Sequence, residues 1–154
     1  MFSQIRREAV VSRRFFADEN SLETRIGVNV HRTFLLLGAT AGFLGVAMGA
    51  FGAHGLRATL DDYHLAIFRT GVDYQMWHAL ALTLVGMMVK QFPGTRLLVA
   101  AGWLLFAGIV LFSGSLYILS IGGIRWLGWI TPFGGMAFLV GWLLLGLSAW
   151  RLEN

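Results

Sequence analysis

Four long stretches of apolar residues follow one another along the chain, separated by short polar segments. They run from about 33 to 51, 70 to 89, 97 to 121 and 132 to 150. A helix of ~20 mainly apolar residues crosses the ~30 Å hydrocarbon core of a bilayer. The pattern therefore predicts an all-α protein, a four-helix transmembrane bundle that occupies 33–151, followed by a short tail at 152–154.

The segment between the first two apolar stretches is amphipathic. One face repeats at helical spacing and is apolar except for a histidine; its residues are Leu56, Leu60, His64, Ile67 and Phe68. The charged residues Arg57, Asp61, Asp62 and Arg69 face elsewhere. The glycines on either side of His54 give the backbone the freedom that a sharp exit from the first helix needs. We therefore expect a short amphipathic helix at the membrane surface between the first and second spans.

Composition agrees with a membrane protein and excludes several kinds of chemistry. Of the 154 residues, 56% are hydrophobic and only 13% are charged, which is too apolar for an ordinary soluble domain. The absence of cysteine excludes disulfides, thiolate metal sites and cysteine nucleophiles. No basic patch is interleaved with aromatic residues, so we expect no nucleic acid as a partner. The lipid bilayer is the partner that the composition predicts.

Residues 1–32 form a basic segment without an apolar run of span length. The apolar core of a signal peptide is missing from it. We interpret this segment as a basic tail, disordered or weakly attached to the membrane. An arginine-rich transit peptide is one alternative, and an extension upstream of a natural start near Val28 is another.

The distribution of lysine and arginine predicts the orientation in the membrane. Nine of the twelve lie in the tail, in the 90–96 loop or at Arg151, whereas Arg57, Arg69 and Arg125 fall on the opposite side. Cytoplasmic loops carry the excess of positive charge. Both termini should therefore be cytoplasmic in a multi-pass protein of the bacterial inner membrane, or of the mitochondrial inner membrane if the source is eukaryotic.

Glycines recur on single faces of the predicted helices, where small residues let two helix backbones approach closely. In the first span five glycines alternate at steps of three and four residues. The glycines that we expect at helix contacts are Gly38, Gly42, Gly45, Gly49, Gly52, Gly114, Gly135 and Gly141.

The second predicted span carries an unusual set of polar residues. Together with His54 at the preceding corner, the candidates for a polar core or a ligand site are Asp73, Tyr74, Gln75 and His78. Polar groups that face lipid are costly, so Gln75 and His78 should turn inward. Hydrogen bonds between helices are the interpretation that we favour, and a small-ligand or proton-linked site is the alternative. For Asp73, in the first turn of the predicted span, we expect an ion pair with Arg69 or a favourable helix-start charge.

Catalytic motifs are missing from the sequence. It contains no nucleophile with a neighbouring base, no HExxH pattern and no phosphate-binding glycine loop after a strand. His54 and His78 would need a third ligand to hold a metal or haem, and roughly 12 Å of helix separates His78 from the outer end of its span. We therefore expect neither catalytic residues nor a metal or other cofactor.

Four ordered segments carry a resemblance to a known family. They are GAFGAHGL (49–56), FRTGVDYQMWHALAL (68–82), LFSGSLYIL (111–119) and PFGGMAFLVGWLLL (132–145). In order and spacing they resemble the small bacterial inner-membrane family of unknown function typified by the YgdD protein, which has distant mitochondrial relatives. The resemblance implies a four-helix membrane protein and brings no activity, substrate or cofactor.

The sequence favours a non-enzymatic accessory or assembly subunit that self-associates or joins a larger membrane complex. The excess of small-residue faces over chemically active groups is the reason for this preference. The alternative is a pathway for a small solute or protons, or a ligand site, centred on Gln75 and His78.

Overall fold

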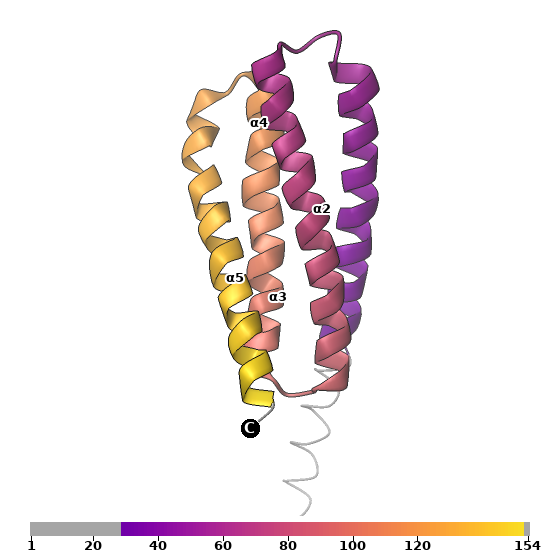
Figure 1. The fold of residues 1–154 in the computed structure, drawn as a ribbon, viewed down its shortest axis with the longest axis vertical. Coiled ribbons are helices and arrows are strands. Elements are labelled where there is room, and N and C mark those ends of the chain that lie inside the picture. Colours follow the sequence, from indigo (N-terminus) through magenta and orange to yellow (C-terminus); the bar gives the residue numbers. More distant parts are fainter. Residues whose placement is uncertain (1–28, 153–154) are drawn as a thin grey trace, which may run out of the picture.

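The computed structural model describes residues 29–152, and all of these residues belong to helices or to the short connections between them. The long helices run alternately up and down, and both ends of the described chain lie at the same end of the bundle (Figure 1). In chain order the elements are the first helix Asn29–Leu56, which ends in the π-helical turn η1 (Gly52–Leu56), then α2 (Asp62–Gln91), α3 (Arg96–Gly108), η2 (Ile109–Ser113), α4 (Gly114–Gly122), η3 (Arg125–Trp129) and α5 (Thr131–Leu152). The predicted all-α class is confirmed.

Three helical segments among residues 29–152 are long and apolar enough to cross a membrane. They are Asn29–Leu56, Arg96–Gly122 and Arg125–Leu152. The longest single helix, α2, has 30 residues and is not among the three. It carries the polar residues Asp73, Gln75 and His78. The structure thus contains four long helical segments and three candidate spans, where the sequence predicted four spans.

The prediction of a separate short surface helix between the first two spans was wrong. The first helix continues to Leu56 through η1, and a short turn leads to α2, which begins at Asp62 and runs without a break through Thr70. Asp61 caps this start, because its carboxylate accepts a hydrogen bond from the backbone N–H of His64 at 2.8 Å. The helix continues through Gly71, whose missing side chain leaves room for the ring of Tyr117. A Cβ added at Gly71 would lie 2.9 Å from that ring.

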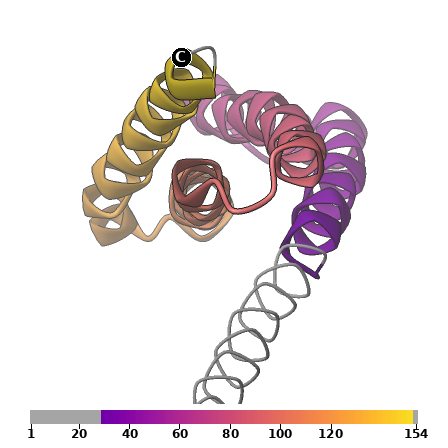
Figure 2. The ribbon, with the colours of Figure 1, turned by 90° about the horizontal axis from the view of Figure 1, so that it is seen from below.

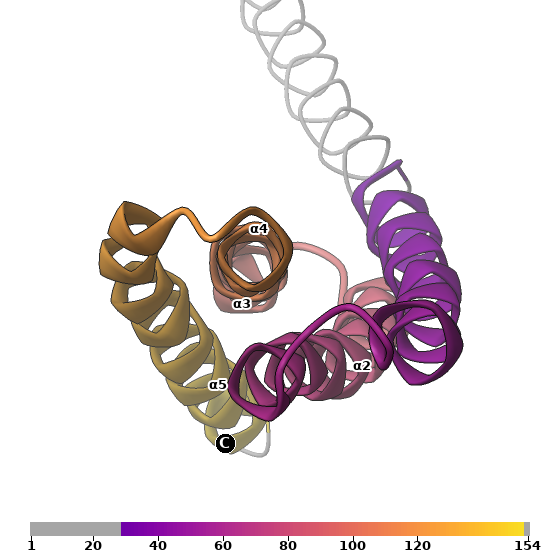
Figure 3. The ribbon, with the colours of Figure 1, turned by 90° about the horizontal axis from the view of Figure 1, so that it is seen from above.

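The helices are arranged around the α3–α4 segment. Seen from either end, α3 and α4 lie between α2 and α5, and the first helix lies on the far side of α2 (Figures 2 and 3). The backbones of α5 and the central segment approach closely at Gly134, where an added Cβ would meet the backbone N of Phe112 and lie 2.8 Å from its Cα. The central segment is therefore the element against which α2 and α5 are positioned.

The apolar residues divide between a buried core and an exposed outer surface. Phe34, Leu82 and Leu105 are fully buried, whereas Phe43 is 74% exposed and Leu139 is 66% exposed. Large exposed apolar side chains occur on every long helix. Soluble monomers rarely expose apolar patches of such extent, so this outer surface is suited to lipid. The basic tail that the sequence predicts at 1–32 lies almost wholly outside the described residues.

Candidate functional site

Gln75 joins three helical segments near the middle of the bundle. Its side chain is only 5% exposed, its Nε2 donates to the carbonyl oxygen of Ala41 at 2.8 Å, and its Oε1 accepts from the hydroxyl of Tyr117 at 2.9 Å. A backbone carbonyl only accepts, so the amide NH₂ must face the first helix and the amide oxygen must face α4. Both ends of the side chain are thus engaged.

His78 lies one turn further along α2 and contacts α5. Its Nδ1 is 2.7 Å from the carbonyl oxygen of Tyr74, and its Nε2 is 3.2 Å from the indole Nε1 of Trp142. The carbonyl only accepts and the indole only donates, so both contacts require the neutral imidazole with its proton on Nδ1. The ring also stacks on Phe138, with centroids 3.4 Å apart and planes inclined by 13°.

Aromatic rings surround His78 and extend the contact to the central segment. We call Tyr74, His78, Phe112, Phe138 and Trp142 the aromatic cluster. The rings of Tyr74 and Phe112 stack at 4.5 Å, and those of Phe112 and Phe138 are 5.7 Å apart. These separations are typical of favourable aromatic pairs. The cluster therefore connects α2, η2 and α5, whereas Gln75 connects α2 to the first helix and α4.

Two other predicted candidates, Asp73 on α2 and His54 in η1, make no hydrogen bond with Gln75 or His78. Asp73 is exposed and forms no ion pair with Arg69; among residues 29–152 the ion pair present joins Asp61 to His64 at 2.9 Å. The helix-start interpretation of Asp73 was wrong, because α2 begins at Asp62, eleven residues earlier. His54 is exposed in η1, where the neighbouring Gly52 packs against Phe68. The structure does not bring His54 to Gln75 and His78.

The glycines predicted on the first helix differ in what they face. Gly38, Gly45, Gly49 and Gly52 face α2; an added Cβ at Gly45 would lie 2.5 Å from the sulfur of Met76 and one at Gly49 would lie 3.4 Å from Val72. Gly42 has no atom within 4 Å of the position of an added Cβ. Four of these five positions therefore require a small residue or allow close packing inside the protomer, and Gly42 faces open space.

The glycines predicted on the later helices are also divided. An added Cβ would lie 3.0 Å from Leu105 at Gly141 and 3.8 Å from Phe112 at Gly135, whereas Gly114 faces open space. Five further glycines pack closely against another helix and are not among the predicted contact positions, namely Gly71, Gly86, Gly102, Gly108 and Gly134. Each lies against a ring or a backbone whose position depends on the packing of the helices, so spacing along one helix does not reveal it.

Tyr117 and Trp142, which bond to Gln75 and His78, are partners that the sequence reasoning also missed. A signal for Trp142 exists, since it lies in the middle of a predicted span, and a tryptophan away from the interface needs a partner for its N–H. Other buried hydroxyls also have partners. Ser115 donates to the carbonyl oxygen of Phe112 at 2.9 Å and lies 2.8 Å from the hydroxyl of Thr131 on α5, and Ser148 donates to the carbonyl oxygen of Leu144. Among residues 29–152, the buried Ser113 Oγ is the exception and has no hydrogen-bond partner.

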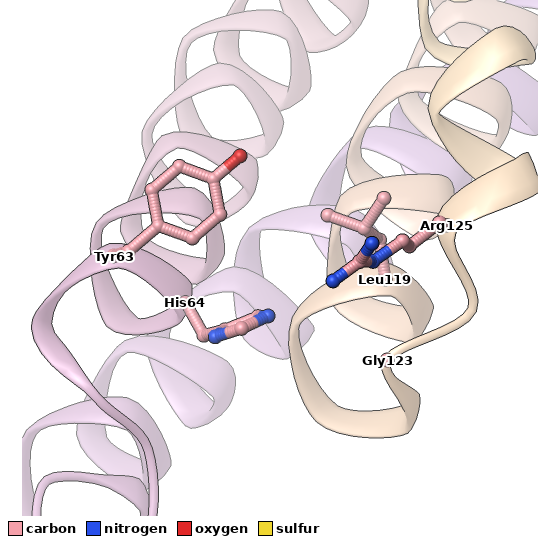
Figure 4. Close-up of a pocket in the computed structure, with 5 residues that line it drawn as sticks. All are labelled: Tyr63, His64, Leu119, Gly123 and Arg125. Atoms are coloured by element: carbon pink, nitrogen blue, oxygen red, sulfur yellow. The ribbon is translucent and has the colours of Figure 1, made fainter.

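A pocket of about 360 Å³ lies at the end of the bundle where α2 begins and α4 ends. It is lined by Tyr63, His64, Leu119, Gly123 and Arg125 (Figure 4). Next to the pocket, the backbone N–H of His64 donates a hydrogen bond to the carboxylate of Asp61. This bond is the main reason that the pKa of Asp61 lies below its ordinary value, and the hydrogen bond from the His64 side chain is the second. Within residues 29–152, no group of three or more His, Asp or Glu side chains is placed to hold a metal ion.

The long helices, the exposed apolar exterior and the polar contacts between helices define a small helical integral membrane protein. The family described as "Protein of unknown function (DUF423)" matches residues 48–135. The chain is 49% identical over 118 residues to the UPF0382 membrane protein YwdK of Bacillus subtilis, an alignment that covers 77% of this chain and 96% of YwdK. It is 46% identical over 122 residues to the UPF0382 membrane protein SH2409 of Staphylococcus haemolyticus, covering 78% of this chain and 97% of that protein.

The chain therefore belongs to the UPF0382 (DUF423) family of membrane proteins of unknown function. The expected resemblance to a small bacterial membrane family of unknown function is confirmed at this level. YwdK and SH2409 are both named UPF0382 membrane proteins, and the finer expectation of a likeness to the YgdD protein in particular is not shown by them. No solved structure matches the chain.

Proposed function

We propose that this protein is a non-enzymatic accessory or assembly subunit, a four-span bundle that acts through its outer surface as a member of a larger membrane assembly or as a self-associating unit. The observation that supports this proposal most directly is the bridge made by Gln75. One side chain joins the first helix and α4 to α2 through bonds of 2.8 and 2.9 Å. The polar groups of the interior are thereby used to fix the arrangement of the helices.

The contacts of His78 add to this argument. Both ring nitrogens have partners, and the ring face is covered by Phe138. Hydrogen bonds between membrane helices contribute about 0.6 kcal/mol on average. A ligand or a transported proton would have to displace such contacts, whereas a structural role uses them as they are. The interior is therefore better suited to holding a fixed shape than to passing a solute.

We take α2 as the fourth span. Its 30 residues, at 1.5 Å each, extend about 45 Å, enough for a hydrocarbon core of ~30 Å. It runs alongside the candidate spans (Figure 1), and its buried polar groups, Gln75 and His78, turn toward other helices as a membrane requires. Gln75 and His78, together with the exposed Asp73, make it less apolar than the other long helices.

The excess of basic residues at one side supports the proposed orientation, with both termini cytoplasmic. Nine lysines and arginines fall on that side and three on the other. The location would be the bacterial inner membrane, or the mitochondrial inner membrane in a eukaryote. We also propose that, within its family, this protein is related to the YgdD protein.

The test is purification of the tagged protein from native membranes in a gentle detergent, followed by native mass spectrometry. We expect a defined complex that contains a stoichiometric companion protein or a second copy of the chain. Two glycines on opposite flanks of the bundle provide matched variants, Gly42 on the first helix and Gly146 on α5, because open space surrounds the position of a Cβ at both. Gly42→Leu and Gly146→Leu should both fold, and the companion should be lost from only the variant whose flank it occupies.

A protein that remains a single protomer after cross-linking in native membranes would contradict this proposal. The alternative, a pathway for protons or a small solute at Gln75 and His78, is examined in liposomes. A pH-dependent flux that is abolished in His78→Ala, and retained in Gly42→Leu, would replace the accessory role with transport.

A further inference from the structure

The end pocket, defined by Tyr63, His64, Leu119, Gly123 and Arg125, is separate from the polar centre around Gln75. At about 360 Å³ it falls within the size range of small-molecule sites. It is formed by the first turn of α2, the last turn of α4 and the start of η3. None of its groups takes part in the contacts that hold the helices of the centre together.

Arg125 is the permanently charged residue in the pocket wall. It is exposed and has neither an ion pair nor a hydrogen bond within residues 29–152. Figure 4 shows its guanidinium and the imidazole of His64 directed toward each other across the pocket. Arginine presents five N–H donors and binds phosphate groups with two at a time. An unpaired arginine at the wall of a pocket is therefore a natural anion ligand.

The opposite wall supplies hydrogen-bonding groups. Tyr63 is 71% exposed, and its hydroxyl has no partner within the described chain. The Nδ1 of His64 lies 2.9 Å from both carboxylate oxygens of Asp61. Because this contact engages Nδ1, Nε2 is the nitrogen of His64 that remains for a ligand. Asp62, the other acid at this end of α2, is exposed.

The surroundings of the pocket place it at the depth of lipid headgroups. Trp126 and Trp129, which follow Arg125 in η3, are 64% and 78% exposed. Exposed tryptophans of membrane proteins concentrate at the boundary between hydrocarbon and water. Leu119 adds an apolar wall on the side of α4. A ligand with a charged group and an apolar part would match both kinds of wall.

We propose that the end pocket binds a phosphate group at the membrane surface, with Arg125 as its cationic ligand and the hydroxyl of Tyr63 as a hydrogen-bond donor. Two sources carry this chemistry, the headgroup of an anionic phospholipid and a water-soluble phosphate ester. The proposal does not depend on the accessory role proposed above, because it concerns a different part of the molecule.

The test is a binding titration followed by native mass spectrometry of the full-length protein, delipidated in a non-ionic detergent. The probes are phosphatidylglycerol, diacylglycerol with the same acyl chains but no phosphate, and glycerol 3-phosphate with no acyl chains. Arg125→Gln is compared with Arg57→Gln, because Arg57 is an exposed arginine at the same end of the bundle and outside the pocket. Thermal unfolding of each variant checks that the fold is kept.

We expect Arg125→Gln to weaken phosphatidylglycerol binding tenfold or more, and Arg57→Gln to change it less than twofold. Tyr63→Phe removes only a hydroxyl, so it folds even if Arg125→Gln does not, and it should weaken binding about threefold. Glycerol 3-phosphate that binds by itself and competes with the lipid would identify a soluble ester as the source; binding of the lipid alone would identify the headgroup. Equal effects of the two arginine variants, or diacylglycerol binding as well as phosphatidylglycerol, would overturn the proposal.

Discussion

The polar centre and the end pocket use similar residues in opposite ways. In the centre, Gln75 and His78 are buried. The amide of Gln75 bonds to two other helical segments, and Nε2 of His78 accepts from Trp142 on α5. In the end pocket, Tyr63 and Arg125 are exposed and have no hydrogen-bond partner within residues 29–152. Unmatched polar groups are costly in hydrocarbon but can be solvated at the membrane surface. Depth in the membrane therefore separates groups that hold the fold from groups that remain available to ligands.

This comparison predicts that the cost of substitution falls from the centre toward the end of the bundle. The largest effect is expected at Gly134, where a Cβ would collide with the backbone of Phe112. Gly134→Ala should lower the free energy of unfolding by about 2 kcal/mol or more, because backbone atoms of two helices must separate. Gly114→Ala is the matched control, since open space surrounds the same position there. Unfolding in detergent measures both, and equal stabilities would show that α5 does not approach η2 this closely.

The next effect is expected at Gln75, which connects three helical segments. Gln75→Leu keeps most of the side-chain volume and removes both interhelical bonds, so it should cost about 1–2 kcal/mol of unfolding free energy. Tyr117→Phe removes one of the two bonds and should cost about 0.6 kcal/mol. The double variant should cost less than the sum of the single variants, because both changes remove the same bond. Additive costs would mean that Gln75 and Tyr117 do not interact.

The inward orientation of Gln75 and His78 was predictable from the sequence, because a polar side chain that faces lipid is costly and one that faces another helix can form a hydrogen bond. Their partners were not. Tyr117 and Trp142 come from other helices, and which residue meets Gln75 depends on the order and rotation of the helices in the bundle. Periodicity along one chain segment contains no information about either.

The start of α2 shows a different reason for failure. Thr70 and Gly71 have low helix propensity, and they suggested a boundary between a surface helix and a span. In the structure Thr70 bonds back to the carbonyl oxygen of Ala66 at 3.0 Å, and the missing side chain of Gly71 makes room for Tyr117. Tertiary packing thus outweighed local propensity, and the effective boundary is the cap at Asp61.

A smaller effect is expected at the contact between His78 and Trp142. Trp142→Phe keeps an aromatic ring but removes the N–H that reaches Nε2, so it should cost about 0.6 kcal/mol. Trp77→Phe is the control, because Trp77 is 69% exposed on the same helix as His78. Nitrogen NMR of the imidazole adds an independent measurement. The wild type should show the proton on Nδ1, and only Trp142→Phe should shift the Nε2 resonance; a proton on Nε2 would contradict the contact.

The smallest effect is expected beside the end pocket, where the cap of α2 is exposed to solvent. The pKa of Asp61 is lowered mainly by the hydrogen bond from the backbone N–H of His64. A carboxyl whose pKa is lower in the folded state stabilises the fold above its unfolded pKa of about 3.9, and this contribution is lost as the pH falls through the folded value. Asp61→Asn keeps a capping residue and does not titrate. The thermal stability of the wild type should therefore exceed that of Asp61→Asn at pH 7, and the difference should disappear on acidification below about pH 4. A difference that persists at low pH would show that the charge of Asp61 does not account for its stabilisation of the start of α2.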